Sequence, residues 1–101
     1  MDLFESIARR HSYRGEFERR PVPRADLEKI VQAGIQAPSG KNEQTTSFVI
    51  VDDPKLLGQL AAAIRRPVCN TAAAMIVCIT DSRPVFEGMS FYLEDCAAAV
   101  E

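Results

Sequence analysis

The stretch SFVIVD, residues 47–52, decides the fold class, because it predicts a strand. It is a short apolar run that ends at an aspartate. A second run of the same kind, AMIVCIT, covers residues 74–80. Short continuous apolar runs are typical of strands that are covered on both faces. The sequence therefore predicts two buried strands, and since two strands make only a small sheet, we expect further strands to come from elsewhere.

Four segments around these two runs carry apolar residues at helical spacing. The first follows Asp2, a residue type that favours the helix N-cap, and the second runs from about Arg24 to Gln36 between prolines. The third follows Asp53, where the next proline fits a first helical position, and the fourth begins near Ser90. Helices that surround two central strands predict a layered α/β or α+β arrangement.

The fourth segment places Leu93, Cys96, Ala97 and Val100 on one side of its helix and is still in full pattern at Glu101. A chain of 101 residues predicts one domain at most, here residues 1–101. We expect the chain to stop inside this helix, because no terminating signal follows it.

The composition is that of an ordinary globular protein, with 47% apolar and 26% charged residues. No apolar run approaches the ~20 residues of a membrane span, and the first residues lack the order of a signal peptide. The three cysteines form no CxxC pair, which favours reduced thiols and a cytoplasmic location over a disulfide framework or a zinc site.

The formal charge of −2 hides an asymmetry. Residues 9–24 hold six arginines against two glutamates, a net of +4, which leaves −6 for the rest of the chain. A protein that follows a nucleic-acid backbone usually has a broadly basic face. We therefore expect no nucleic-acid partner, and the strip favours a small, localised anion.

The stretch RRHSYRGEF, residues 9–17, lies at the centre of this basic strip. In an extended backbone Arg10, Ser12 and Arg14 point the same way, because side chains alternate. Two guanidinium groups and a hydroxyl suit a phosphate, although a solvated basic loop fits the same composition. His11 is read as a surface or packing histidine, and the chain has no second histidine for a metal site.

The stretch APSGKNEQ, residues 37–44, is rich in loop-forming residues and could simply be a turn between helix and strand. A functional interpretation is that Pro38 and Gly40 shape a backbone that lies close to a planar ligand. Asn42 and Gln44 carry amides, which offer both a donor and an acceptor. Such an amide can pair with a ring edge that alternates C=O and N–H, as a flavin pyrimidine does.

Taken in order, these motifs resemble the opening half of the FMN-dependent nitroreductase family. The resemblance continues through FVIVDDPKLLGQL, residues 48–60, and through FYLEDCAAAVE, residues 91–101, so it spans nearly the whole chain. It implies an α+β, nitroreductase-like layered fold with helices around a central, mostly antiparallel sheet. Family members usually run about twice this far, so we expect the fold to be incomplete here.

The resemblance also implies which residues contact FMN. Arg10 and Ser12 match the segment that holds the phosphate, while Arg14 matches a position at the flavin N1/O2 edge. Pro38 and its neighbours match a loop packed against the isoalloxazine ring. The full implied set is Arg10, Ser12, Arg14, Pro38, Ser39, Gly40, Asn42 and Asn70, with Asn42 as a polar contact and Asn70 at the pyrimidine edge.

The implied activity is that of an FMN-dependent NAD(P)H oxidoreductase. Family members are homodimers with FMN at the interface, and they pass hydride from NADH or NADPH through flavin N5 to nitroaromatics, quinones or similar acceptors in two half-reactions. No catalytic side chain and no metal is expected, because the flavin carries the chemistry. Thr45 and Thr46 replace the proline and aromatic residue that often follow the loop, so the acceptor stays open.

Two alternatives stay open beside this activity. The chain could be a non-catalytic FMN-binding or dimerising fragment that lacks the C-terminal half of the site. It could also be an anion-responsive interaction module that binds no flavin. Within the enzyme class, related members carry out dehalogenation or flavin destruction, and the sequence is compatible with either.

Overall fold

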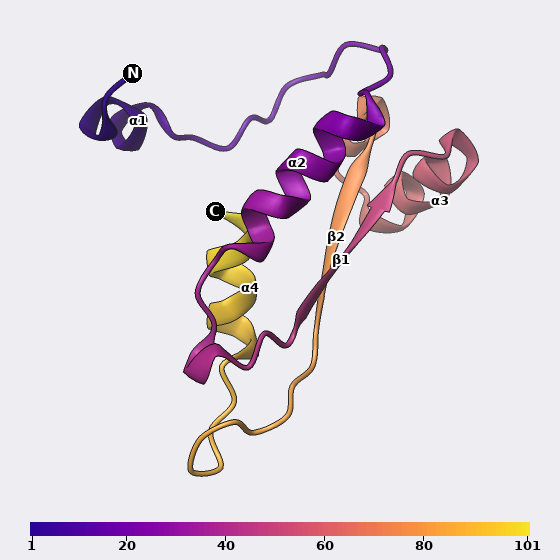
Figure 1. Cartoon of the computed structure of the whole chain (residues 1–101). Helices are drawn as coiled ribbons and strands as arrows, with labels where there is room; N and C mark the ends of the chain where they lie inside the picture. Colours follow the sequence, from indigo (N-terminus) through magenta and orange to yellow (C-terminus); the bar gives the residue numbers. More distant parts are fainter.

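Two antiparallel strands form the centre of the computed structural model, which describes residues 1–101. Strand β1 (Thr46–Val51) pairs with β2 (Met75–Thr80), so that Phe48 lies opposite Cys78 and Val49 opposite Val77. Both strands lie within one residue of the predicted ranges. All four predicted helices are present as well, which confirms the α+β class (Figure 1).

Helices α2 (Arg24–Ile35) and α4 (Tyr92–Val100) pack on the same face of this two-stranded sheet. Gly34 of α2 marks the contact, since a Cβ there would lie 2.9 Å from Cζ of Phe48 and 3.2 Å from the carbonyl oxygen of Ala99. Glycine is needed because any larger residue would push α2 away from both neighbours. On β2, the Sγ atom of Cys78 lies 3.6 Å from that of Cys96 in α4.

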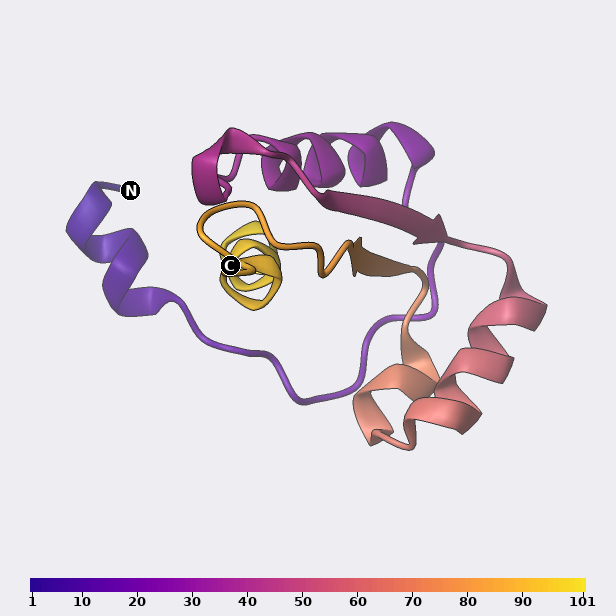
Figure 2. The ribbon, with the colours of Figure 1, turned by 90° about the horizontal axis from the view of Figure 1, so that it is seen from below.

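Helix α3 (Pro54–Ile64) and the 3₁₀ turn η2 (Pro67–Thr71) pack against each other beyond the ends of the strands (Figure 2). The Asp53 carboxylate caps α3 by accepting a hydrogen bond from the Leu56 N–H at 3.0 Å. This contact and the proline at the first helical position explain why the helix starts where the sequence predicts. The buried apolar residues of the chain are few: Leu27, Val51, Leu57 and Ala61.

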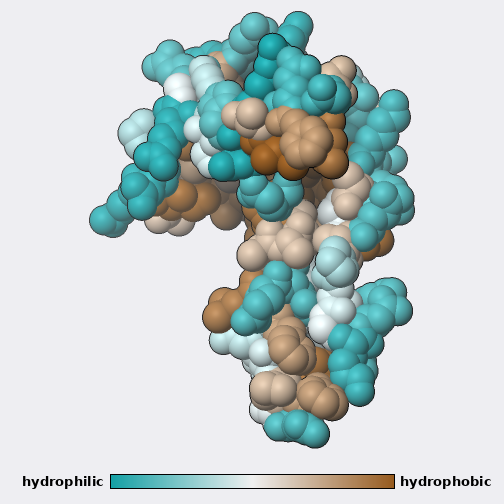
Figure 3. Space-filling model, turned by 90° about the vertical axis from the view of Figure 1, so that its left-hand side faces the viewer, coloured by the Kyte–Doolittle hydropathy of each residue, from teal (hydrophilic) through white to brown (hydrophobic).

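Helix α1 (Leu3–Arg9) lies away from the rest of the molecule, at the end of an extended arm (Figures 1 and 2). The predicted cap is confirmed, because the Glu5 N–H donates to Oδ1 of Asp2 at 2.7 Å. None of the α1 residues is buried, and Figure 3 shows apolar surface on the side of the molecule where α1 lies. The radius of gyration is 15.6 Å, against about 13 Å for a compact domain of this length.

The prediction that both strands are covered on both faces is wrong for this chain. The exposure of β1 alternates along the strand, and Val49, Val77 and Ile79 are 37–50% exposed. The reason is that α2 and α4 both pack against the face that carries Phe48 and Cys78, while α3 lies beyond the strand ends. On the opposite face only Val51, at the end of β1, is buried.

The predicted apolar side of the fourth helix is only partly covered. Leu93 is 66% and Val100 is 72% exposed, whereas Asp95 is buried and Cys96 is half-buried. Helix α4 is apolar on nearly every side, so its contacts with the loop and the sheet decide which side is covered. The assignment of residues 1–101 to one domain stays a prediction, and no helix has the length and apolar character to span a membrane.

Candidate functional site

The loop between α2 and β1 is held in place by a buried carboxylate. The backbone N–H of Gly40 donates to Oδ1 of Asp95 in α4 at 2.9 Å, and only 7% of Asp95 is exposed. Gly40 also lies against the Phe91 ring, since a Cβ there would come within 2.6 Å of the ring's Cγ. A residue with a side chain cannot occupy this position without moving α4 or the loop.

The same loop stores backbone strain. Lys41, Asn42 and Gln44 have φ angles of 52°, 56° and 53°, in the left-handed region that non-glycine residues rarely adopt. Two hydrogen bonds hold this shape: the Gln44 N–H donates to Ser39 Oγ at 3.0 Å, and Gln44 Nε2 donates to Asn42 Oδ1 at 3.1 Å. Clustered strain of this kind is found at ligand-binding segments, where the surrounding structure holds a fixed shape.

A second loop supports this one from outside. Lys41 Nζ lies 4.6 Å from the centre of the Phe86 ring, and Arg83 forms an ion pair with Glu43 at 3.7 Å. Both contacts are exposed, and such exposed contacts contribute little stability. They orient the outer side of the loop, whereas Asp95 fixes its inner side.

Two predicted residues that lie far apart in the sequence meet in one cavity. Arg14 and Asn70 line a cavity of about 180 Å³ together with Pro67 and Thr71. The arm is tied to this place because the Phe17 N–H donates to Oγ1 of Thr71 at 2.8 Å. The arm and the 3₁₀ turn η2 therefore border one cavity, which Glu16 also lines.

The other two residues of the predicted phosphate seat have different surroundings. Arg10 Nε forms an ion pair with Oε1 of Glu101 at 2.8 Å, and both side chains are largely exposed. Ser12 is exposed, and none of the principal cavities includes it. His11 is exposed too, with Nδ1 at 2.9 Å from the Arg9 carbonyl oxygen.

The chain does not bring the two halves of the predicted site together. Pro38 and Ser39 line a separate cavity of about 110 Å³ that also includes Thr46 and Asp95. None of the principal cavities contains residues of both the arm at 10–14 and the loop at 38–44. Each half therefore exists on its own in this chain.

Asp95 is the residue that the sequence interpretation missed. One signal was present, namely two adjacent acidic residues, Glu94 and Asp95, in a mostly apolar helical stretch, with Asp95 four positions after the Phe91 that packs on Gly40. Positions i and i+4 share a helix face, so the ring and the carboxylate approach the loop together.

One titratable group near α4 has a shifted pKa. Burial is the main cause that raises the pKa of the Cys78 thiol to about 11, and the adjacent Cys96 adds to it.

Comparison with known proteins gives a consistent result. The sequence profile of the nitroreductase family matches residues 7–79. A protein of Archaeoglobus fulgidus named "Putative NADH dehydrogenase/NAD(P)H nitroreductase" is 33% identical over 84 residues, which cover 81% of this chain and 48% of that protein. The chain spans about half the length of the curated relatives that it matches.

Solved structures agree with the sequence comparison. A nitroreductase family protein from Clostridium novyi NT superimposes with a TM-score of 0.81 at 27% identity, over 99% of this chain and 60% of the other. An FMN-dependent nitroreductase from Clostridium difficile R20291 superimposes with a TM-score of 0.80 at 28% identity, over 97% and 56%. The helices and strands described above are thus similar to the matching part of these folds.

Proposed function

Because this chain belongs to the nitroreductase family, we propose that it supplies part of an FMN-dependent NAD(P)H oxidoreductase acting on nitroaromatics, quinones or similar acceptors. The observation that carries the proposal is the meeting of Arg14 and Asn70 in one cavity. The family resemblance assigns both of these residues to the same edge of the flavin. The name of the Clostridium difficile neighbour supports FMN as the cofactor.

The residues of the cavity suit the pyrimidine edge of a flavin. The Asn70 amide can donate to a ring carbonyl and accept from a ring N–H, and the Arg14 guanidinium is a fixed positive charge. A positive charge beside N1 and O2 would favour negative charge at that edge and so raise the reduction potential. FMN, when bound, would supply the chemistry by taking hydride from NAD(P)H and passing it to the acceptor.

The loop at 38–44 suits the flat face of the same ring system. Its backbone conformation is already fixed by Asp95 and by the hydrogen bonds of Gln44, so binding a planar ligand would cost little additional ordering. The NH₂ group of Asn42 is the donor that the loop can offer, because its oxygen is engaged by Gln44. We assign Pro38, Ser39 and Gly40 to the backbone that lies against the ring.

The phosphate would need Arg10 and Ser12. Arg10 is now paired with Glu101, and a phosphate would replace this carboxylate as the partner of the guanidinium. Exchange is cheap, because an exposed ion pair is worth only about 0–1 kcal/mol. Since FMN is larger than either cavity and the two halves lie apart, we propose that a second copy of the protein completes the site as a homodimer.

A second candidate is a non-catalytic FMN-binding or dimerising fragment. It is favoured by the separation of the two half-sites in this chain and by the half-length match to the curated relatives. We propose the cytoplasm as the location in either case, because the three cysteines are free thiols and reduced thiols are typical of that compartment.

The experiment that tests the proposal is a titration of the purified chain with FMN, followed by absorbance and flavin fluorescence. Binding should be saturable, and Arg14→Ala should weaken it about tenfold or more, because a charge-assisted hydrogen bond is worth roughly 1.5–3 kcal/mol. Arg66→Ala is the matched control, since Arg66 lies outside all these cavities. Oxidation of NAD(P)H with a quinone then separates the enzyme from the fragment.

Three results decide between the candidates. Saturable FMN binding with turnover supports the oxidoreductase, and saturable binding without turnover supports the fragment. If FMN does not bind, or if Arg14→Ala and Arg66→Ala have equal effects, the flavin assignment is wrong.

A further inference from the structure

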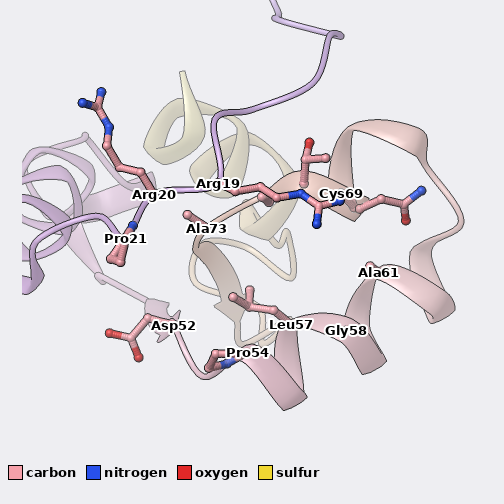
Figure 4. Close-up of a pocket in the computed structure, with 13 residues that line it drawn as sticks. Arg19, Arg20, Pro21, Asp52, Pro54, Leu57, Gly58, Ala61, Cys69 and Ala73 are labelled. Atoms are coloured by element: carbon pink, nitrogen blue, oxygen red, sulfur yellow. The ribbon is translucent and has the colours of Figure 1, made fainter.

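A pocket of about 390 Å³ lies between residues 19–21, helix α3 and residues 69–73, which cover part of η2 and the segment before β2 (Figure 4). Leu57 and Ala61, which are both buried in the fold, form its apolar wall on the α3 side. Gly58 opens this wall further, because a Cβ added there would meet nothing within 4 Å. The pocket therefore has unfilled room directly beside its apolar surface.

Three charged residues line the pocket, and two of them are neutralised. Asp52 is paired with Arg24 at 3.2 Å, and Arg20 is paired with Glu18 at 3.3 Å. In Figure 4 the Asp52 and Arg20 side chains point away from the pocket, whereas Arg19 reaches across it towards Cys69. Arg19 takes part in none of the ion pairs of the chain. The pocket thus holds one uncompensated positive charge next to an apolar wall.

A planar guanidinium is weakly hydrated and binds a carboxylate through two parallel hydrogen bonds. The remaining wall consists mainly of small aliphatic side chains from α3 and from the residues before β2, and no aromatic ring lines the pocket. The pocket therefore offers no ring on which a flat ligand could stack, whereas its apolar wall can cover an alkyl chain. These features together define an amphipathic ligand with one anionic end.

We propose that this pocket binds a straight-chain aliphatic carboxylate, with its carboxylate on Arg19 and its alkyl chain between the α3 wall and the half-buried Ala72 and Ala73. The site goes beyond the oxidoreductase function, because it needs neither flavin nor electron transfer. It shares Asn70 and Thr71 with the cavity that contains Arg14, so the two sites meet at the η2 turn. The binding itself involves no covalent step.

The test is a titration of the ¹⁵N-labelled chain with octanoate, followed by amide chemical shifts. Saturable shifts are expected at Gly58 and Asn70. The affinity should rise by roughly two- to fourfold per methylene from butyrate to octanoate, since each buried methylene contributes a constant apolar gain. Octanol, which lacks the charge, should bind at least about tenfold more weakly.

Two variants and one control locate the site. Arg19→Gln should raise the dissociation constant of octanoate about tenfold or more, and Gly58→Leu should abolish binding by filling the pocket. Arg66→Gln removes the same charge outside the pocket and should leave the affinity unchanged. Should Gly58→Leu fail to fold, the comparison of Arg19→Gln with Arg66→Gln decides alone.

The proposal is overturned by any of three results. Octanoate could cause no saturable shift at the pocket residues, or Arg66→Gln could weaken binding as much as Arg19→Gln does. Inorganic phosphate could also shift the Gly58 amide with the same affinity as octanoate, which would show that the apolar wall plays no part. A result in which FMN fails to bind while octanoate binds would affect only the proposed oxidoreductase function.

Discussion

The loop at residues 38–44 and the arm at residues 10–14 are both assigned to one cofactor, yet they are built in opposite ways. The loop carries three left-handed residues and is fixed by a carboxylate that is almost fully buried. The arm is exposed along its whole length and carries an ion pair whose side chains are 57% and 65% exposed. The loop's shape therefore comes from the chain's own packing, while few contacts within the chain hold the arm.

Removal of the Asp95 carboxylate should have the largest effect on stability. Asp95→Ala leaves the Gly40 N–H without its partner and creates a small void in α4, so the free energy of unfolding should fall by about 2–3 kcal/mol. Urea denaturation followed by circular dichroism measures this. Glu94→Ala is the matched control, because Glu94 is the exposed neighbour on the same helix. Equal losses in both variants would show that the loop is not anchored by Asp95.

Gly40→Ala should have the next largest effect. The added Cβ would collide with the Phe91 ring, and overpacking of this kind costs about 1–2 kcal/mol when neighbours can shift. Gly58→Ala serves as the control, because the added methyl meets nothing and an alanine favours a helix interior by roughly 0.5–1 kcal/mol. The two substitutions should therefore change the urea midpoint in opposite directions, and the comparison fails if they do not.

A rise in pH above 9.0 should weaken the packing of α4 on β2, where Cys78 lies beside Cys96. The pKa of Cys78 is raised from 9.0 to about 11, so the fold favours the neutral thiol. Its contribution to stability is complete below pH 9.0 and is lost as the pH rises towards about 11. The urea midpoint of the wild type should fall more steeply across this range than that of Cys78→Ala. Parallel pH profiles would mean that the thiol is as well solvated in the folded state as in the unfolded one.

Arg10→Ala should have the smallest effect on stability and a clear effect on binding. An exposed ion pair contributes about 0–1 kcal/mol, so the unfolding free energy should change by less than either loop substitution. Retention of FMN during gel filtration should nevertheless fall further than in Arg66→Ala. If Arg10→Ala unfolds the chain, or if both variants retain FMN equally, the arm is either structural or uninvolved.

The local structure of the fold could be predicted because local chemistry determines it. Asp2 and Asp53 cap the helices that follow them, and the two apolar runs form strands within one residue of their predicted ends. The covered faces could not be predicted. The runs at 47–52 and 74–80 are apolar on both sides, and only the placement of α2 and α4 determines which side is packed.

The candidate site likewise has parts that local sequence predicts and parts that depend on packing. The loop at 38–44 could be proposed as a site from its residue types, and Asn70 from the resemblance, and both assignments stay predictions. Asp95 could not be recognised, because its role depends on a contact with Gly40 that forms only when α4 packs under the loop. The contact of Arg14 with the Asn70 cavity likewise depends on how the arm crosses η2, which no local pattern encodes.

The two-stranded sheet has a consequence for how the fold can grow. Each strand is hydrogen-bonded on one side only, so β1 and β2 each present an outer row of backbone N–H and C=O groups without a strand partner. A further strand can join at just two places, outside β1 or outside β2, and never between them. Any protein or segment that extends this sheet must therefore pair with the outer edge of β1 or of β2. An exposed edge strand is also where identical chains would pair and aggregate at high concentration.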